Sequence, residues 1–266
     1  PVSKSMKVKE QIQTVVEWLD LPYNTRPQMI SVHVPQMEEK SHKEKPDSPK
    51  MDEHIKEVDD AIGYLTKEIF SRNLDPHAHI VIVSDHGMVS TSKYKLIYID
   101  DILPHHLLEY VKNASPSSVL HFRPNISSNV VQEIYQQLIH HTKTSHFKVY
   151  LRENMPIRYH YKHSDRISPI QAIPNIGYQF VTHSMEFNEG GDHEGYDNLA
   201  DAMGSIFLAR GPKVSKIYKP GTVLEPFVNV EVYGFMTELL NINAAPNNGT
   251  VGTKFPILYE PPFPPK

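Results

Sequence analysis

The run Ile80–Val83 (Ile-Val-Ile-Val) limits the possible folds of this chain more than any other feature. Four β-branched residues in succession favour a strand, and a strand without alternating polar residues is typical of one buried on both faces of a parallel sheet. Residues 51–72 before it carry apolar side chains at helical spacing, and residues 29–34 predict a shorter strand before that helix. With a charged loop at residues 38–50, these segments predict a right-handed βαβ unit. The chain is therefore expected to be an α/β protein.

The rest of the chain extends this pattern. Further helices are expected at residues 7–19, 129–140 and 228–240, and further strands at residues 147–151, 176–182 and 205–209. We expect residues 1–252 to form one domain. Residues 253–266 are rich in proline and predict an extended tail.

Composition excludes several kinds of site. The chain has no cysteine, which excludes disulfides, thiolate zinc sites and a cysteine nucleophile, whereas its 16 histidines allow a metal site built from His, Asp and Glu. The net charge of −4 argues against a broad basic face for nucleic acid. No run approaches the roughly 20 apolar residues that a membrane-spanning helix needs, so no transmembrane segment is expected within the chain.

Three clusters of potential metal ligands lie beside expected strands. Asp85 and His86 directly follow the strand Ile80–Val83, Glu38 and His42 lie four residues apart, and His193 lies in a glycine-rich stretch before residues 205–209. Ligands of open α/β sheets bind at the carboxyl ends of the strands, and carboxylate with imidazole is a donor set that suits zinc. Each cluster also has a plain interpretation from the residues alone: a turn cap, a solvated run of charges, and a histidine in a polar loop.

Several ordered motifs point to one family. Residues 81–88, Val-Ile-Val-Ser-Asp-His-Gly-Met, resemble the metal-binding signature of the nucleotide pyrophosphatase/phosphodiesterase family of the alkaline phosphatase superfamily. Residues 191–198 resemble the family's Gly-Asp-His-Gly-Tyr-Asp-Asn, and residues 46–59, 229–233 and 245–250 are similar to other parts of the same domain. The resemblance implies an alkaline-phosphatase-like, mostly parallel sheet sandwiched by helices, with its N-terminal portion missing from this chain.

The resemblance also implies a chemistry. Members of this family hydrolyse nucleotide phosphodiester or pyrophosphate bonds at a two-zinc centre, with a Thr nucleophile. By position in the motifs, the metal ligands would be Glu38, His42, Asp85, His86 and His193. Two such ions clamp a phosphoryl group and activate its attacker. The implied partner is a nucleotide or another phosphodiester substrate.

The chain departs from the family pattern at four places and lacks the nucleophile. Glu38 stands where the family has Asp, and Ser41 and Lys45 stand where it has glycine. Glu194 is an extra residue, so that either His193 or Glu194 takes the third ligand position; His193 is favoured because the motif begins Gly-Asp-His. The nucleophile and its Asp are expected upstream of residue 1, so no catalytic residue is assigned within the chain.

Two alternatives to an active nucleotide phosphodiesterase follow. The first is a degenerate or truncated relative that binds metal or a partner without turnover, and for the isolated chain we expect no measurable turnover. The second is a phosphomutase or sulfatase of the same superfamily, which the Gly-Tyr-Asp-Asn at residues 195–198 argues against.

Three N-x-[ST] sequons, at Asn113, Asn125 and Asn248, permit a glycoprotein of the secretory pathway or an extracellular location.

Overall fold

The chain forms two compact units, each of which is described by itself. The computed structural model describes residues 6–112, 119–123, 125–143 and 145–261. The first unit comprises Pro1–Val34, Lys56–Asp85 and Ile206–Lys266, and the second comprises Pro35–Ile55 and His86–Ser205. The chain passes between the units at four places, one of which lies within helix α3 (Pro49–Ser71).

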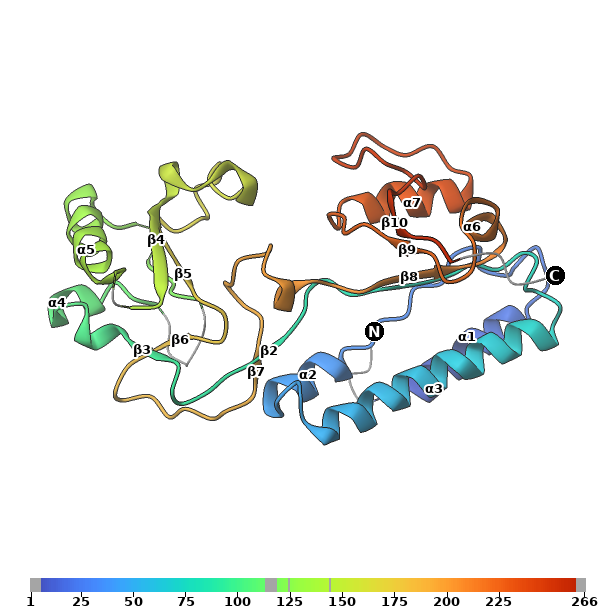
Figure 1. Cartoon of the computed structure of the whole chain (residues 1–266), viewed down its shortest axis with the longest axis horizontal. Helices are drawn as coiled ribbons and strands as arrows, with labels where there is room; N and C mark the ends of the chain where they lie inside the picture. The colour runs from blue at the N-terminus through green and yellow to red at the C-terminus, as the bar shows by residue number, and fades with distance from the viewer. Residues whose placement is uncertain (1–5, 113–118, 124, 144, 262–266) are drawn as a thin grey trace. The chain divides into compact units, whose positions relative to one another are not determined.

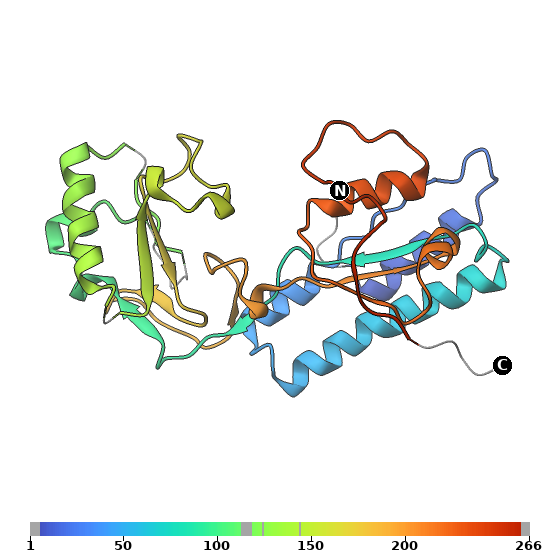
Figure 2. The same ribbon diagram turned by 45° about the horizontal axis from the view of Figure 1, so that its top comes forward.

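The first unit is built on a pair of strands with helices on both sides. Strands β1 (Ile80–Val83) and β8 (Phe207–Arg210) pair antiparallel, and β8 leads into the short helix α6 (Pro212–Ile217). Helix α7 (Glu231–Leu240) lies on one side of the pair and helices α1 (Val8–Leu19) and α3 lie on the other (Figures 1 and 2). A small antiparallel pair, β9 (Val223–Leu224) and β10 (Ile257–Tyr259), completes the unit.

Two apolar clusters hold the first unit together. Rings of Phe207, Phe235 and Phe255 lie against one another with centroids 5.2 to 5.8 Å apart, which is the spacing of favourable aromatic pairs. Helices α1 and α3 pack through the apolar stripes that their sequences predict, with Ile12 and Val16 against Ala61. Burial of apolar surface therefore fixes both helix layers of this unit.

The second unit contains the largest core. Strands β4 (Phe147–Leu151) and β5 (Ile170–Pro174) pair antiparallel, and helix α5 (Ser128–His141) buries Ile134 and Leu138 in the same cluster. Strands β3 (Leu96–Tyr98) and β6 (Gln179–Val181) pair in parallel. The unit also contains the helix α4 (His105–Leu108) and the single 3₁₀ turns η1 (Ile99–Asp101), η2 (Arg152–Asn154), η3 (Ile157–Tyr159) and η4 (Asp201–Met203).

A short ladder and a helix in the second unit carry the segments of the candidate site. Strands β2 (Val89–Ser90) and β7 (Gly191–Asp192) pair antiparallel, with Val89 opposite Asp192. Helix α2 (Gln36–Lys43) packs against β7. Three segments that are far apart in sequence therefore meet here.

The structure corrects two of the sequence predictions near the N-terminus. Residues 29–34 form no strand, and Met29 is 56 % exposed, so the predicted βαβ unit is absent. A short apolar run becomes a strand only where a neighbouring strand pairs with it, which its own sequence cannot specify. The charged loop expected at residues 38–50 begins instead as helix α2, because Gln, Glu, Lys and Met are good helix formers and Pro35 occupies its N-terminal cap position.

The pairing of β1 also differs from the expectation. We predicted a strand buried on both faces of a parallel sheet, but β1 pairs antiparallel with β8, and Val83 is half exposed. Among the strand pairs that the structure describes, β3–β6 is the parallel one. A hydrophobic run therefore predicted the strand but not the direction of its partner, because the partner lies more than a hundred residues away.

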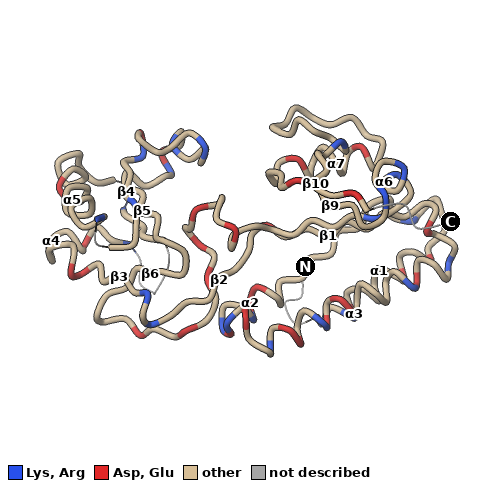
Figure 3. The backbone as a smooth tube through the Cα atoms, in the orientation of Figure 1, with Lys and Arg blue, Asp and Glu red and all other residues tan. Residues whose placement is uncertain are grey.

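Most other elements are confirmed. The expected helices at residues 7–19, 51–72, 129–140 and 228–240 are α1, α3, α5 and α7, and the expected strands are β1, β4, β6 and β8. Strand β10 lies in the stretch predicted to be an extended tail, of which residues 262–266 are outside the described part. Acidic and basic residues are interspersed along the chain (Figure 3), and no described helix is long and apolar enough to cross a bilayer.

Candidate metal centre

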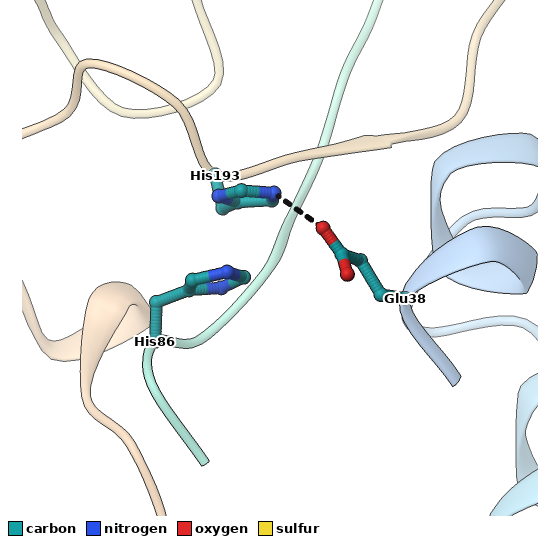
Figure 4. A group of neighbouring side chains, drawn as sticks. All are labelled: Glu38, His86 and His193. Atoms are coloured by element: carbon teal, nitrogen blue, oxygen red, sulfur yellow. Dashed lines mark ion pairs between the residues drawn. The ribbon is translucent and has the colours of Figure 1, made fainter. Parts of the chain in front are cut away.

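Three of the predicted ligands lie together in the second unit. Glu38, His86 and His193 each offer a donor atom, and these atoms lie within 4.8 Å of one another. Glu38 comes from α2, His86 from the segment before β2, and His193 from the loop after β7 (Figure 4). The structure thus brings a carboxylate and two imidazoles from three separate segments to one point.

The side chains face one another. The rings of His86 and His193 are stacked, with centroids 3.6 Å apart and an angle of 11° between their planes. Glu38 Oε1 lies 3.5 Å from His193 Nε2 and 3.9 Å from His42 Nε2. The His42 ring lies 5.1 Å from that of His193, so His42 borders the same cluster.

Backbone carbonyls orient two of the imidazoles. His42 Nδ1 lies 3.0 Å from the Gly191 carbonyl oxygen, and His86 Nδ1 lies 2.7 Å from the Gly87 carbonyl oxygen. A carbonyl oxygen only accepts hydrogen bonds, so Nδ1 carries the hydrogen in both rings. In the neutral ring this leaves a lone pair on Nε2, the arrangement that metal-binding histidines require.

His193 has a buried nitrogen that forms no hydrogen bond with the described residues. Its side chain is 14 % exposed, and within the described part of the chain its Nε2 is buried and forms no hydrogen bond. Burial, followed by the nearby His86 and His42, lowers the pKa of His193, while Asp192 and Glu38 act in the opposite direction. The ring therefore favours the neutral state, and a cation would satisfy a buried nitrogen that is otherwise costly. The donor set fits a zinc-like ion.

Glycines allow the strand and the helix to approach. A Cβ on Gly190 would lie 2.1 Å from the His42 carbonyl oxygen, and a Cβ on Gly191 would lie 2.3 Å from the Ser41 carbonyl oxygen. No side chain fits at such distances, so the two glycines place β7 directly against the turn of α2 that carries His42. This close contact also lets the Gly191 carbonyl reach His42 Nδ1.

Ser41 and Lys45 stand where the family resemblance implies glycine, and each side chain has a hydrogen-bond or ion-pair partner. Ser41 is buried and its Oγ donates to the Glu38 carbonyl oxygen (2.9 Å). Lys45 pairs with Glu189, with 2.6 Å between Nζ and Oε2, and so links the end of α2 to the segment before β7. Both side chains therefore take part in holding the region in which Glu38 and His42 lie.

The other two residues considered as ligands lie outside this cluster. Asp85 is the last residue of the first unit, where its carbonyl oxygen accepts a hydrogen bond from Asn229 Nδ2 (3.0 Å). Glu194 is exposed, and its backbone N–H donates to Asp192 Oδ1 (3.1 Å). Of the two alternatives for the third ligand, His193 is the residue whose side chain reaches Glu38 and His86.

A second group of potential ligands occurs in the same unit. Asp100, Asp101 and His183 have donor atoms within 4.8 Å of one another. The His183 backbone N–H donates to Asp100 Oδ2 (2.9 Å), and His183 Nε2 lies 3.0 Å from Asp101 Oδ1. The side chains of His183 and Asp101 are more than half exposed and pair with each other, whereas Asp100 Oδ1 is buried and forms no hydrogen bond with the described residues. Sequence reasoning did not single out this group, because its members lie about eighty residues apart without a motif.

A comparison with known protein families decides the family. The family model for type I phosphodiesterase / nucleotide pyrophosphatase matches residues 1–197. The chain belongs to the type I phosphodiesterase / nucleotide pyrophosphatase family. The matched stretch contains α2, the segment with His86, and β7 with His193.

Similar proteins are known in yeast and mammals. An uncharacterised pyrophosphatase/phosphodiesterase of Schizosaccharomyces pombe is 34% identical over 260 residues, which are 94% of this chain and 52% of the relative. Ectonucleotide pyrophosphatase/phosphodiesterase family member 3 of Rattus norvegicus is 34% identical over 268 residues, covering 99% of this chain and 30% of the relative. The chain thus spans about half or less of the length of these relatives.

Solved structures confirm the fold. Human ectonucleotide pyrophosphatase/phosphodiesterase 5 superposes with a TM-score of 0.79 at 27% identity, covering 96% of this chain and 64% of that one. The murine protein, solved as an inactive threonine-to-alanine variant in complex with AMP, gives a TM-score of 0.78 at 29% identity, with coverages of 96% and 64%. The α/β, alkaline-phosphatase-like fold expected from the sequence is therefore confirmed.

Proposed function

We propose that this chain supplies the metal-binding centre of a zinc-dependent hydrolase of nucleotide phosphodiester or pyrophosphate bonds. The observation that carries the proposal is the buried Nε2 of His193, which forms no hydrogen bond within the described residues and lies 3.5 Å from Glu38 Oε1, on a ring stacked with that of His86. Family membership supports the reaction class.

Each residue has a role in this proposal. Glu38, His42 and His193 would hold one ion, and Asp85 and His86 would contribute to the other. Bound zinc stabilises negative charge on phosphoryl oxygens and activates a nucleophile. The chain's own part is to fix the orientation and tautomer of the imidazoles, which the carbonyls of Gly191 and Gly87 do for His42 and His86.

We further propose a nucleotide as the substrate class. The murine relative of similar fold was solved in complex with AMP, and the names of several relatives describe nucleotide pyrophosphatases.

The names of the relatives also describe ectonucleotide enzymes, so we propose an extracellular or secretory-pathway location. In line with this, Asn125 and Asn248 are exposed, as glycosylation requires, whereas Asn113 lies outside the described residues.

A non-catalytic, metal-binding relative is the second candidate. The observation that favours it is the composition of the cluster itself. Glu38, His86 and His193 are metal ligands in type, and none of the three carries a hydroxyl group that would attack phosphorus. On this alternative, the chain binds zinc and does not turn over a phosphodiester.

Calorimetric titration with zinc, together with hydrolysis of a chromogenic nucleotide phosphodiester, tests both candidates. We expect the chain to bind zinc and His193→Ala to lose about a hundredfold or more in affinity, whereas His106→Ala should bind like the parent chain. His106 is a suitable control because it is exposed and lies 3.0 Å from Glu133, outside the cluster.

The outcomes separate the candidates. Turnover that depends on Asp85 and on zinc supports the hydrolase and overturns our expectation that the isolated chain shows no turnover. Zinc binding without turnover supports the non-catalytic relative. Absence of zinc binding, or binding that is unchanged in His193→Ala, contradicts both.

A further inference from the structure

We infer that Gln179, acting through Asp192, is a positioning residue for His193. The inference rests on the proposed role of His193 as a metal ligand. Gln179 lies on β6, fourteen residues before His193, and belongs to no metal-binding motif of the sequence. Its connection to the candidate centre exists only in the folded chain.

A buried hydrogen bond joins Gln179 to Asp192. Gln179 Nε2 donates to Asp192 Oδ2 over 2.7 Å, and the two residues are 6 % and 5 % exposed. A carboxylate at such a depth is costly unless donors surround it. Loss of the Gln179 amide would leave Asp192 Oδ2 without this donor, so the pair is a determinant of where the carboxylate lies.

The other oxygen of the same carboxylate holds the backbone of the ligand loop. Asp192 Oδ1 accepts from the backbone N–H of His193 (2.8 Å) and from that of Glu194 (3.1 Å). The orientation of the Asp192 carboxylate therefore sets the direction of the chain at His193, and with it the direction of the imidazole. Gln179 holds Asp192 Oδ2, and Asp192 Oδ1 holds the backbone of His193 and Glu194.

Gln179 is itself fixed by the core of the second unit. Strand β6 pairs in parallel with β3, where Gln179 lies opposite Leu96, and the Gln179 backbone N–H donates to the Lys95 carbonyl oxygen (3.0 Å). The neighbouring Phe180 is buried in the main cluster of this unit. A continuous series of contacts therefore runs from a core strand through Gln179 and Asp192 to the backbone of His193.

Two other contacts hold the far end of the same loop. Tyr196 OH donates to the Tyr178 carbonyl oxygen (3.0 Å), and Arg158 forms two hydrogen bonds to the Asp197 carboxylate (2.8 and 2.5 Å). These contacts lie three and four residues beyond His193. By contrast, Asp192, which Gln179 holds, accepts a hydrogen bond from the His193 backbone N–H itself.

Three variants test the inference. Gln179→Leu removes the donor at similar volume. Asp192→Asn removes the charge but keeps an oxygen for the His193 and Glu194 amides, and the Gln179 amide can turn to accept from the new NH₂. Gln171→Leu is the matched control, because Gln171 lies on β5 and donates to the Ser168 carbonyl oxygen (2.8 Å).

Two readouts are measured on each folded variant: zinc affinity by calorimetry, and hydrogen exchange of the His193 and Glu194 amides in metal-free protein. For Gln179→Leu we expect zinc affinity to fall about ten- to hundredfold and both amides to exchange about tenfold faster or more. Asp192→Asn should stay within about threefold of the parent chain in both, since it keeps the geometry. Gln171→Leu should change neither.

The exchange measurement decides the inference whether or not zinc binds. If the parent chain binds no zinc, the proposed function fails, while faster exchange in Gln179→Leu still supports the positioning role. If zinc binds through His193 and Gln179→Leu leaves both readouts unchanged, the inference alone is overturned. Equal effects from Gln171→Leu, or an Asp192→Asn variant as impaired as Gln179→Leu, also overturn it.

Discussion

The histidines of the candidate centre differ from the exposed His106 in what their nitrogens contact. Nδ1 of His42 and Nδ1 of His86 face backbone carbonyls, and Nε2 of His193 is buried without a hydrogen bond to any residue that the structure describes, whereas His106 is exposed and pairs with a carboxylate. A carbonyl fixes the ring and its tautomer without adding charge, which a cation site needs. The exposed pairing of His106 with Glu133 constrains the orientation and the tautomer of the His106 ring less.

The length of the Glu38 side chain is testable at this scale. Glu38→Asp restores the residue type that the family resemblance implies, but it withdraws the carboxylate by about one methylene, more than ~1 Å, from His193 and His42. We expect zinc affinity to fall about tenfold in calorimetric titration. Glu39→Asp is the control, because Glu39 is the exposed neighbour on the same helix, outside the donor group. An equal or tighter affinity in Glu38→Asp would show that α2 shifts to compensate.

A histidine in the first unit makes stability depend on pH. Burial, followed by the charge of Lys213, holds the pKa of His79 below its ordinary value of 6.5, and His79 Nε2 accepts from the Lys213 backbone N–H (3.2 Å). The unfolded chain therefore binds the proton first, and the free energy of unfolding decreases as the pH falls below about 6.5. His79→Gln, which keeps an acceptor but does not titrate, should reduce this decrease.

Urea unfolding at about pH 5 and about pH 7.5 checks the His79 prediction. The difference in unfolding free energy between the two pH values should be smaller in His79→Gln than in the parent chain, and unchanged in His77→Gln. His77 is a suitable control because it is an exposed histidine two residues away. A difference that His79→Gln leaves unchanged would contradict the prediction.

At the scale of elements, the candidate centre depends on a strand of two residues and a helix of two turns. Neither α2 nor β7 is long enough to be stable alone. Strand β7 is paired with β2 on one side, and the Thr91 hydroxyl both accepts from the Gly190 N–H (3.0 Å) and donates to the Gly190 carbonyl oxygen (3.3 Å). The geometry of α2 and β7 is therefore imposed by the contact of the two elements with each other, by the pairing of β7 with β2 and by the contacts of the adjacent Gly190 with Thr91.

A methyl group at Gly190 tests the contact between these elements. Gly190→Ala would place its Cβ 2.1 Å from the His42 carbonyl oxygen, so α2 and β7 must separate. We expect a loss of about 1–3 kcal/mol in unfolding free energy, with a loss of zinc affinity of about tenfold or more. Gly63→Ala is the control, since Gly63 lies within α3 and, apart from its chain neighbours and the adjacent helix backbone, no described atom lies within 4 Å of the added Cβ; it should stabilise the chain by about 0.5–1 kcal/mol. Unchanged zinc binding in a folded Gly190→Ala would refute the prediction.

At the scale of the whole molecule, the chain consists of two units with separate cores. The main cluster of the second unit and the aromatic cluster around Phe235 in the first share no residue. The residues Glu38, His86 and His193 all belong to the second unit. Zinc that binds the native state stabilises the part of the chain that must be folded to bind it.

The single tryptophan makes this consequence measurable. Trp18 lies on α1 in the first unit, so its fluorescence reports the unfolding of that unit, whereas circular dichroism reports both. At a zinc concentration of about 100 times Kd, binding stabilises the native state by about 2.7 kcal/mol. We expect zinc to raise the thermal midpoint seen by circular dichroism more than the midpoint seen by Trp18, and EDTA to reverse the effect. Equal shifts of both midpoints would show that the two units unfold together.

Sequence patterns were sufficient for the elements whose signal is local. Amphipathic spacing predicted α1, α3, α5 and α7, because one apolar stripe is enough to bury a helix. The β-branched run predicted β1, and ordered motifs predicted the family and the residues considered as ligands. Sequence patterns failed for residues 29–34, for the direction of the β1–β8 pair, and for α2, where a charged stretch was interpreted as a loop.

The tertiary structure alone decided the details of the candidate centre. No spacing in the sequence connects Gln179 to His193, or Gly190 to the His42 carbonyl, because each contact joins segments that only folding brings together. The extra Glu194 left the third ligand open in the sequence, and the turn after β7 determines which side chain faces Glu38. Periodicity along the chain determines which residues are buried, whereas donor geometry requires positions accurate to a fraction of an ångström, and these come from packing between distant segments.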